Sequence, residues 1–161
     1  KLWRHNQRKN NVNYKFQENL RKRLWKIIKY RREKSSKELL GCSLTFYNIW
    51  LQYTFDEKMS FENYGSYWDI DHVIGLNNYD LSNKEELSES FHWSNTRALE
   101  KSENYRKSDN IICSYIENNN KQLEQFNKIH DFKKSLTNIL TEMGNPQGIL
   151  KRNFQTPSTT K

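Results

Sequence analysis

The chain has 161 residues, of which 34% are hydrophobic and 14% aromatic, and it carries a formal net charge of +8. This length suits one domain with extensions, and its small core depends on aromatic side chains, each of which buries a large area. The charge favours a polyanionic partner, nucleic acid before an anionic membrane surface, with a generally solvated basic protein as the competing interpretation. Because the sequence has no apolar run of about 20 residues, we expect no membrane span.

The two cysteines, Cys42 and Cys113, do not form a C-x-x-C pair, which argues against a structural zinc knuckle. A single disulfide remains possible, but two free thiols in a reducing cytosol are the simpler interpretation. We therefore expect an intracellular protein, in the cytoplasm or nucleus of a host cell.

Basic residues dominate positions 1–37, where only Glu18 and Glu33 oppose them. Four apolar residues recur at helical spacing in this segment: Leu20, Leu24, Ile27 and Ile28. They predict an amphipathic basic helix with an apolar stripe that docks and basic faces that can meet phosphates. An ordinary solvated face is the alternative, and a membrane-surface helix is disfavoured because the stripe is narrow. The residues assigned to nucleic-acid binding here are Arg21, Lys22, Arg23 and Lys26.

Capping signals predict two further helices in the next segment. Ser35 and Ser36 can cap a short helix that ends at Gly41 in a left-handed conformation, and Ser43 can begin a helix over residues 44–54. The apolar face of the second helix is expected to pack against the strands that follow.

Residues 67–74 alternate apolar and polar side chains, as a half-buried strand does, and they include the pair Asp71-His72 just before a polar loop. Residues 91–99 form a second strand-like run, with a short helix over 84–90 between the two. A third segment, 103–110, has the character of a helix start with Ser102 as N-cap.

Beyond position 110 the pattern is weaker. Residues 111–117 are expected to extend the preceding helix, and Asn118-Asn119-Asn120 to form a loop. Two amphipathic helices follow, stopped by the Gly- and Pro-containing segment 144–148, and the polar tail from Lys151 is expected to be disordered unless bound.

Three blocks in this order carry a family resemblance: Ile-Asp-His-Val-Ile at 70–74, Phe-His-Trp-Ser-Asn at 91–95 and Asn-Tyr-Arg-Lys-Ser-Asp at 104–109. With them the sequence resembles the HNH endonucleases, whose core is the ββα-metal finger, and most of all the short HNH proteins of phages and large DNA viruses. The likeness covers about residues 40–110, less than half of the chain.

The resemblance implies a role for each matching residue. Asp71 and Asn104 would bind one divalent cation, Mg²⁺ or alternatively Mn²⁺, because hard cations prefer oxygen ligands. His72 would be the general base and Asn95 would orient the catalytic loop. Because neighbouring strand residues point to opposite faces, Asp71 and His72 can serve one phosphate only if the strand bends or ends there. Taken singly, each residue also has an ordinary explanation as a cap, a turn residue or a hydrogen-bonded core histidine.

Other polar residues near the blocks have two interpretations. Arg97, Arg106 and Lys107 could clamp phosphates that flank the cut, or be surface charges. Asp69 could join the outer metal shell or be solvent-exposed. His92 is interpreted as structural.

We therefore expect an α+β, mostly helical fold: a basic helical arm over 1–40, an HNH nuclease domain over 41–110 and a helical C-terminal extension over 111–161. The expected activity is metal-dependent hydrolysis of phosphodiester bonds in double-stranded DNA, by a virus- or phage-encoded enzyme. The alternative is a non-catalytic HNH-fold component of a larger nucleic-acid assembly or virion. A third interpretation, an RNA-binding or ribosome-associated protein, is not supported by any RNA-recognition motif in the sequence. Recognition sequence, nicking versus double-strand cutting and oligomeric state stay open.

Overall fold

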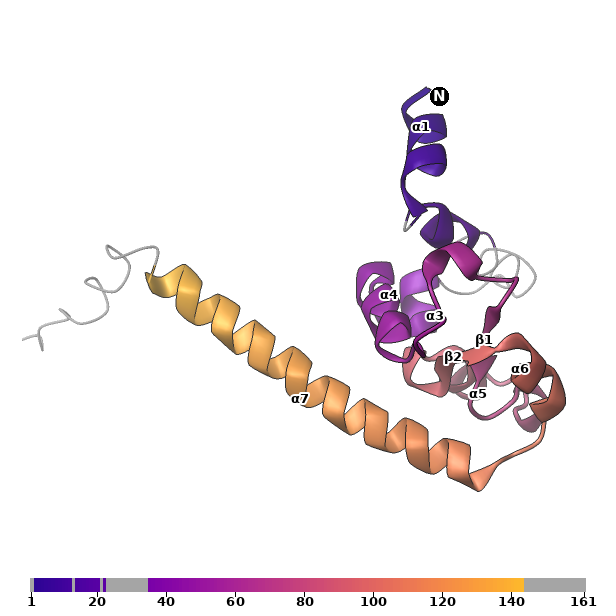
Figure 1. The fold of residues 1–161 in the computed structure, drawn as a ribbon. Coiled ribbons are helices and arrows are strands. Elements are labelled where there is room, and N and C mark those ends of the chain that lie inside the picture. Colours follow the sequence, from indigo (N-terminus) through magenta and orange to yellow (C-terminus); the bar gives the residue numbers. More distant parts are fainter. Residues whose placement is uncertain (1, 13, 21, 23–34, 144–161) are drawn as a thin grey trace, which may run out of the picture. The chain divides into compact units, whose positions relative to one another are not determined.

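The computed structural model describes residues 2–12, 14–20, 22 and 35–143 (Figure 1). Helices and one two-stranded sheet account for its regular structure, which confirms the α+β, mostly helical class. The chain divides into two compact units, Lys1–Gln122 and Leu123–Lys161. The described helices and strands are α1 (Leu2–Asn10), α3 (Ser36–Leu40), α4 (Leu44–Tyr53), β1 (Trp68–His72), α5 (Lys84–Phe91), β2 (Thr96–Glu100), α6 (Lys101–Lys107) and α7 (Cys113–Met143), with 3-10 turns at Phe61–Asn63, Leu76–Asn78 and Trp93–Asn95.

The sheet pairs β1 and β2 antiparallel, with Trp68 opposite Glu100 and His72 opposite Thr96. Figure 1 shows the two strands between α4 and α6. The side chains of β2 are buried from its first residue to the fourth, so both faces of this strand are covered. Because side chains alternate along a strand, the two faces of β2 meet different neighbours.

Neutral hydrogen bonds fasten α4 to β2. The Trp50 indole Nε1 donates to the carbonyl of Thr96 at 2.7 Å, and the Tyr47 hydroxyl lies 2.9 Å from the Thr96 hydroxyl. The backbone N–H of Ala98 donates to the Thr54 hydroxyl at 3.0 Å. We call these contacts the α4–β2 seam. They confirm that α4 packs against the strands, as its apolar pattern predicted.

Aromatic rings surround the first residue of β1. Trp68 is fully buried, and its ring centroid lies 4.7 Å from that of Phe55, 4.9 Å from Tyr64 and 6.0 Å from Phe16. Its indole N–H donates to the carbonyl of Ser60 at 2.7 Å, which satisfies the one polar group of the side chain. Large rings thus contribute much of the core, beside buried aliphatic residues such as Leu39, Leu40 and Leu51.

The caps predicted for the first two helices of the central region are confirmed. The Ser35 hydroxyl accepts from the backbone of Glu38 in a capping box, and the Ser43 hydroxyl accepts from the backbone of Phe46. Gly41 ends α3 with φ +70°, and a Cβ built there would lie 2.4 Å from the His92 ring. Glycine is therefore required at Gly41 both by the backbone conformation and by the close approach of the imidazole.

The predicted basic helix over positions 1–37 lies only partly within the described residues. Positions 14–20 are helical, and Phe16 and Leu20 are buried on their apolar side. Leu24, Ile27 and Ile28, which complete the predicted stripe, lie outside the described residues, as do segment 144–148 and the polar tail. Among the described helices, none is both long enough and apolar enough to cross a membrane.

Three element predictions were wrong. The second strand begins at Thr96 rather than near Phe91, because Phe91 ends α5 and Trp93–Asn95 forms a 3-10 turn. Helix α6 begins at Lys101 with Glu100 as N-cap, and the Ser102 hydroxyl donates to the Glu100 carboxylate instead of capping. The helix also ends at Lys107, because Ser108 adopts φ +49°, so residues 111–117 do not extend it.

The predicted loop at Asn118-Asn119-Asn120 is also wrong, since these residues lie inside the continuous helix α7. Asparagine is a poor helix former, but a tertiary contact overrides a weak propensity. The Asn119 side chain is buried and its Nδ2 donates to the carbonyl of Ser94 at 2.9 Å. The two helices predicted after this loop are parts of the same helix.

Candidate functional site

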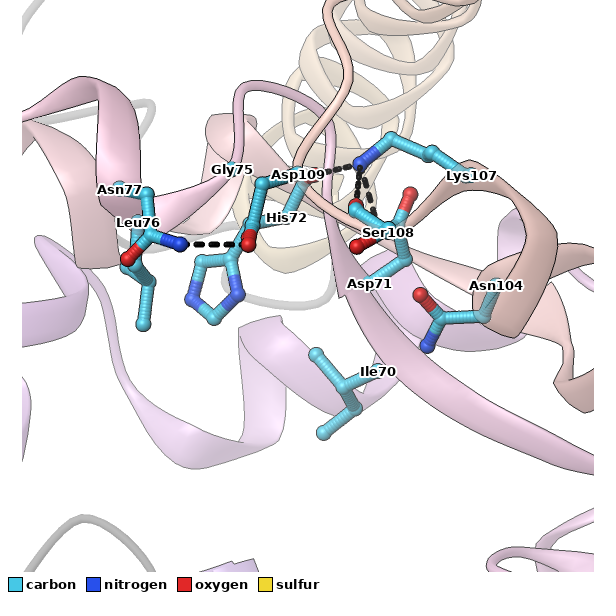
Figure 2. Close-up of a pocket in the computed structure, with 10 residues that line it drawn as sticks. All are labelled: Ile70, Asp71, His72, Gly75, Leu76, Asn77, Asn104, Lys107, Ser108 and Asp109. Carbon is cyan, nitrogen blue, oxygen red and sulfur yellow. Dashed lines mark hydrogen bonds and ion pairs between the residues drawn. The ribbon is translucent and has the colours of Figure 1, made fainter.

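A polar pocket of about 400 Å³ lies where β1 ends beside α6 (Figure 2). It brings together four residues that the sequence singled out from two separate blocks: Asp71, His72, Asn104 and Lys107. The pocket is lined by Ile70, Asp71, His72, Gly75, Leu76, Asn77, Asn104, Lys107, Ser108 and Asp109. The pairing of β1 with β2 and the packing of α6 on both strands create this convergence.

Asp71 is almost fully buried, with 3% of its surface exposed. Its Oδ2 accepts from Nε of Arg97 at 3.1 Å, and its Oδ1 accepts from Nζ of Lys107 at 3.0 Å. Arg97 is its direct partner across the sheet, so strand register alone sets one of these ion pairs. We call these three residues the Asp71 cluster. Its two cations and one carboxylate leave an excess positive charge beside the pocket.

The Lys107 ammonium is held by three oxygen atoms. Besides the Asp71 carboxylate, it donates to the carbonyl of His72 at 2.8 Å and to the carbonyl of Ser108 at 3.5 Å. The side chain is only 1% exposed. A lysine ammonium has three donors and here meets three acceptors, so this part of the pocket is a cation site lined by oxygen.

Arg97 is fixed by contacts on more than one side. Its guanidinium lies 4.0 Å from the ring centroid of Tyr115, and the Tyr115 hydroxyl donates to the carboxylate of Glu103. That hydrogen bond raises the pKa of Tyr115, because the carboxylate stabilises the phenol over the phenolate. Within the part of the chain that the structure describes, Nη2 of Arg97 is buried without a hydrogen-bond partner.

His72 is the last residue of β1, which confirms that the strand ends at the Asp-His pair. The side chain is half-buried, and its ring packs edge-on against Phe91 with 5.4 Å between centroids. Figure 2 shows the imidazole on the side of the pocket near Asn77 and Asp109, and the Asp71 carboxylate on the side of Lys107. The alternation of strand side chains thus gives each residue a different edge of the same pocket.

Asn95 ties the loop after β1 to the residue before β2. Its Oδ1 accepts from the backbone N–H of Ile74 at 2.9 Å, and its Nδ2 donates to the carbonyls of Ile74 at 3.1 Å and Ser90 at 3.0 Å. Its own backbone carbonyl accepts from Val73 at 2.8 Å. The bonds to Val73 and Ile74 constrain the chain just after His72, and the bond to Ser90 ties Asn95 to α5. The catalytic part of the Asn95 assignment stays a prediction.

Asn104 lies on α6, half-buried, and Figure 2 shows its carboxamide facing the pocket beside Asp71. Together these residues offer a carboxylate and an amide oxygen, the donor types that a hard divalent cation prefers. The oxygen-bound ammonium of Lys107 indicates that the same place can hold a positive charge. The donor set therefore fits a divalent cation in kind, although Lys107 engages Oδ1 of Asp71 and Arg97 engages Oδ2. Among the described residues, no three His, Cys, Asp or Glu side chains form a metal-binding group of their own.

Asp109 and Asn77 are pocket residues that received no role from the sequence. The Asn77 amide donates to the Asp109 carboxylate, and the Asn78 amide donates to the Asp109 carbonyl at 3.2 Å. A Cβ on Gly75 would lie 3.1 Å from the Asp109 backbone, so the two loops touch there. Asp109 is the last residue of the third sequence block, and its partners lie in the polar loop after β1. No local sequence signal predicts this contact between the block and the loop.

The basic residues assigned to DNA phosphates divide into three groups. Arg97 and Lys107 are buried in the Asp71 cluster, so the alternative that they are surface charges is wrong. Arg106 is exposed, with its Nε donating to the carbonyl of Ser102 at 3.3 Å, and Lys22 is exposed as well. Arg21, Arg23 and Lys26 lie outside the described residues. A phosphate contact by any of these residues stays a prediction.

His92 and Asp69 lie away from the pocket lining. His92 is half-buried, its Nδ1 lies 2.7 Å from the Ser94 hydroxyl, and burial lowers the pKa of its imidazole. These contacts agree with a structural part for His92 in the turn before β2. Asp69 is half-buried on β1 opposite Leu99.

Comparison with known proteins gives two relatives from a giant virus. An uncharacterized protein designated L246 of Acanthamoeba polyphaga mimivirus is 41% identical over 121 residues, which is 75% of this chain and 54% of the relative. An uncharacterized protein designated L426 of the same virus is 41% identical over 118 residues, which is 73% of this chain and 52% of the relative. The chain thus spans about half the length of these curated relatives. No family model and no solved structure matches it.

Proposed function

We propose that this chain is a metal-dependent endonuclease of the HNH type that hydrolyses phosphodiester bonds in double-stranded DNA. The observation that supports it is the convergence of Asp71, His72 and Asn104 on one polar pocket, although α6 lies far from β1 in the sequence. An unrelated use of these residues as caps or turn residues would not require them to share a pocket. The two strands followed by a packed helix would be the ββα-metal finger of residues 41–110, with 1–40 as DNA-binding arm and 111–161 as extension.

Each residue has a chemical part in this proposal. Asp71 and Asn104 would hold one Mg²⁺ or Mn²⁺, which when bound supplies charge stabilisation at the phosphate and the leaving 3′ oxygen. His72 would take the proton of the attacking water, as an imidazole can near neutral pH. Asn95 would keep the loop beside His72 in place through its bonds to Ile74 and Ser90.

Duplex DNA is the proposed partner because the chain carries a net charge of +8. Arg106 and Lys22 are exposed and available to phosphates, while the other proposed contacts of the arm are Arg21, Arg23 and Lys26. Affinity that depends on such contacts falls steeply with salt. The mimivirus relatives support a virus-encoded protein. Its action inside the host cell is part of the proposal.

The test is cleavage of a supercoiled plasmid with Mg²⁺, with EDTA as control. We expect His72→Ala to lower the cleavage rate by about 100-fold or more, because a positioned general base contributes roughly that factor. DNA binding, followed by fluorescence anisotropy, should stay unchanged. His130→Ala, which removes a histidine of α7 that does not line the pocket, is the matched control. Full activity of His72→Ala would refute the proposed mechanism.

The second candidate is a non-catalytic HNH-fold component of a larger nucleic-acid assembly or virion. It is favoured by one observation: both oxygens of Asp71 are already engaged by cations of the chain itself. Salt-dependent DNA binding by the wild-type protein, without any metal-dependent cleavage of the plasmid, would select this candidate over the enzyme.

A further inference from the structure

We propose that Lys107 is an internal competitor for the metal: its ammonium occupies the cation position of the pocket, and a divalent ion binds Asp71 only by displacing it. This inference rests on the proposed function, because it takes Asp71 as a metal ligand. It adds a residue that controls metal affinity from within the chain.

The geometry around Nζ is the first support. The ammonium and a metal would use the same atom, Oδ1 of Asp71, which lies 3.0 Å from Nζ. The carbonyl of His72 at 2.8 Å is a second oxygen of the kind that hard cations accept. The Lys107 ammonium and a divalent ion cannot both bind Oδ1 of Asp71 without strong repulsion, because charges interact strongly where water is excluded. Occupation by Lys107 and occupation by a divalent ion are therefore alternatives.

The two cations of the Asp71 cluster differ in how firmly they are held. Arg97 lies opposite Asp71 in the sheet, binds Oδ2 and stacks on Tyr115, so its removal would disturb the strand pairing. Lys107 is the last residue of α6 and reaches Asp71 through a flexible four-carbon stem. It can leave the carboxylate while the sheet stays paired. Lys107 is thus the exchangeable cation, and Arg97 still neutralises part of the charge on Asp71.

The backbone next to Lys107 is the second support. Ser108 has φ +49° and ψ −132°, a conformation that a residue with a side chain rarely adopts. Such strain persists only where the surroundings enforce it, and it is concentrated at functional sites. Here it terminates α6 directly after Lys107 and turns the Ser108 carbonyl to within 3.5 Å of Nζ. The conformation of Ser108 therefore places a third oxygen atom beside the ammonium.

The test measures metal binding directly, without DNA and without turnover. Mn²⁺ is titrated into the full chain and free Mn²⁺ is followed by electron paramagnetic resonance. Lys107→Met keeps the stem and removes the charge, so it should bind Mn²⁺ about tenfold more tightly or better, because one charge-assisted hydrogen bond no longer opposes the metal. Asp71→Asn should lose most binding. Lys121→Met, which removes an exposed lysine of α7, should match the wild type.

Lys107→Gln is a second neutral variant, for use if Lys107→Met does not fold. The glutamine amide is uncharged but can still donate a hydrogen bond to Asp71. Lys107→Gln should also bind Mn²⁺ more tightly than the wild type. If the wild type binds Mn²⁺ too weakly to detect, both neutral variants should still show measurable binding. If the neutral variants bind no better than the wild type while Asp71→Asn loses binding, the competitor role is overturned and the metal site stands. Absence of Mn²⁺ binding in every variant overturns the metal site and this inference together.

Discussion

The two faces of β2 are held by opposite kinds of contact. On the face toward α4, the α4–β2 seam consists of neutral donors and acceptors around fully buried Trp50. On the other, the Asp71 cluster packs two cations against one carboxylate in the interior. The first arrangement combines buried aromatic area with satisfied hydrogen bonds. The second places charges where their desolvation is expensive.

This difference separates structural from functional use of the same strand. Each buried ion costs several kcal/mol to desolvate, and well-packed apolar residues in its place are often equally or more stable. Stability alone is therefore a poor reason for the Asp71 cluster, whereas it is a sufficient reason for the α4–β2 seam. The seam fixes β2, and the rigid strand then presents Arg97 to Asp71.

The largest expected loss of stability comes from the α4–β2 seam. Trp50→Ala should lower the free energy of unfolding by about 3–5 kcal/mol, the usual range for deleting a large buried aromatic side chain. Guanidinium denaturation of both proteins measures this loss. Trp3→Ala removes a tryptophan that is 66% exposed and should change stability by no more than about 0.5 kcal/mol. A similar loss in both variants would contradict the assignment of Trp50 to the core.

A slightly smaller loss is expected in the Asp71 cluster. Asp71→Asn leaves two buried cations without their counter-charge and should cost about 3 kcal/mol in urea denaturation. Adding Lys107→Met to it should recover about 1–2 kcal/mol, because the two positions are coupled. If the losses in free energy of unfolding of the two single variants simply added in the double variant, Asp71 and Lys107 would have no coupling energy.

A single neutral hydrogen bond of the seam should matter less. Tyr47→Phe deletes the hydroxyl that lies 2.9 Å from the Thr96 hydroxyl and keeps the ring. We expect a loss of about 1 kcal/mol in the free energy of unfolding, since Thr96 keeps its bond to the Trp93 carbonyl. Tyr105→Phe, at a ring that is 87% exposed, is the control and should be neutral.

The smallest expected effect is the contribution of His92 to the pH dependence of stability. Burial lowers the pKa of His92 below its ordinary value of 6.5, so the unfolded chain binds the proton more readily than the folded one. His92 should therefore contribute stability above pH 6.5 and lose it as the pH falls through the folded pKa. Thermal melting between neutral and mildly acidic pH should show this decline, and His92→Gln should make it shallower. An unchanged slope in His92→Gln would exclude this contribution.

Local signals in the sequence determined many of the elements. Ser35, Gly41 and Ser43 mark helix ends because caps act within one turn of the chain, and alternation over β1 predicts a half-buried strand. The same local logic failed where a distant contact intervened. Asn119 is helical because it is held by Ser94, and α6 stops at Lys107 because Ser108 turns the chain.

The sequence also supplied four residues of the pocket, Asp71, His72, Asn104 and Lys107, from two of the three short blocks that carry the resemblance. Only the tertiary structure decided how they meet: Arg97 and Lys107 are bound to Asp71 instead of lying on the surface, and Asp109 joins the pocket through Asn77. Strand register and the packing of α6 set these contacts, and both depend on groups far apart in the chain. A local sequence pattern identifies which side chains are candidates for a site. The partner of a buried charge depends on tertiary contacts between residues that are far apart in the chain.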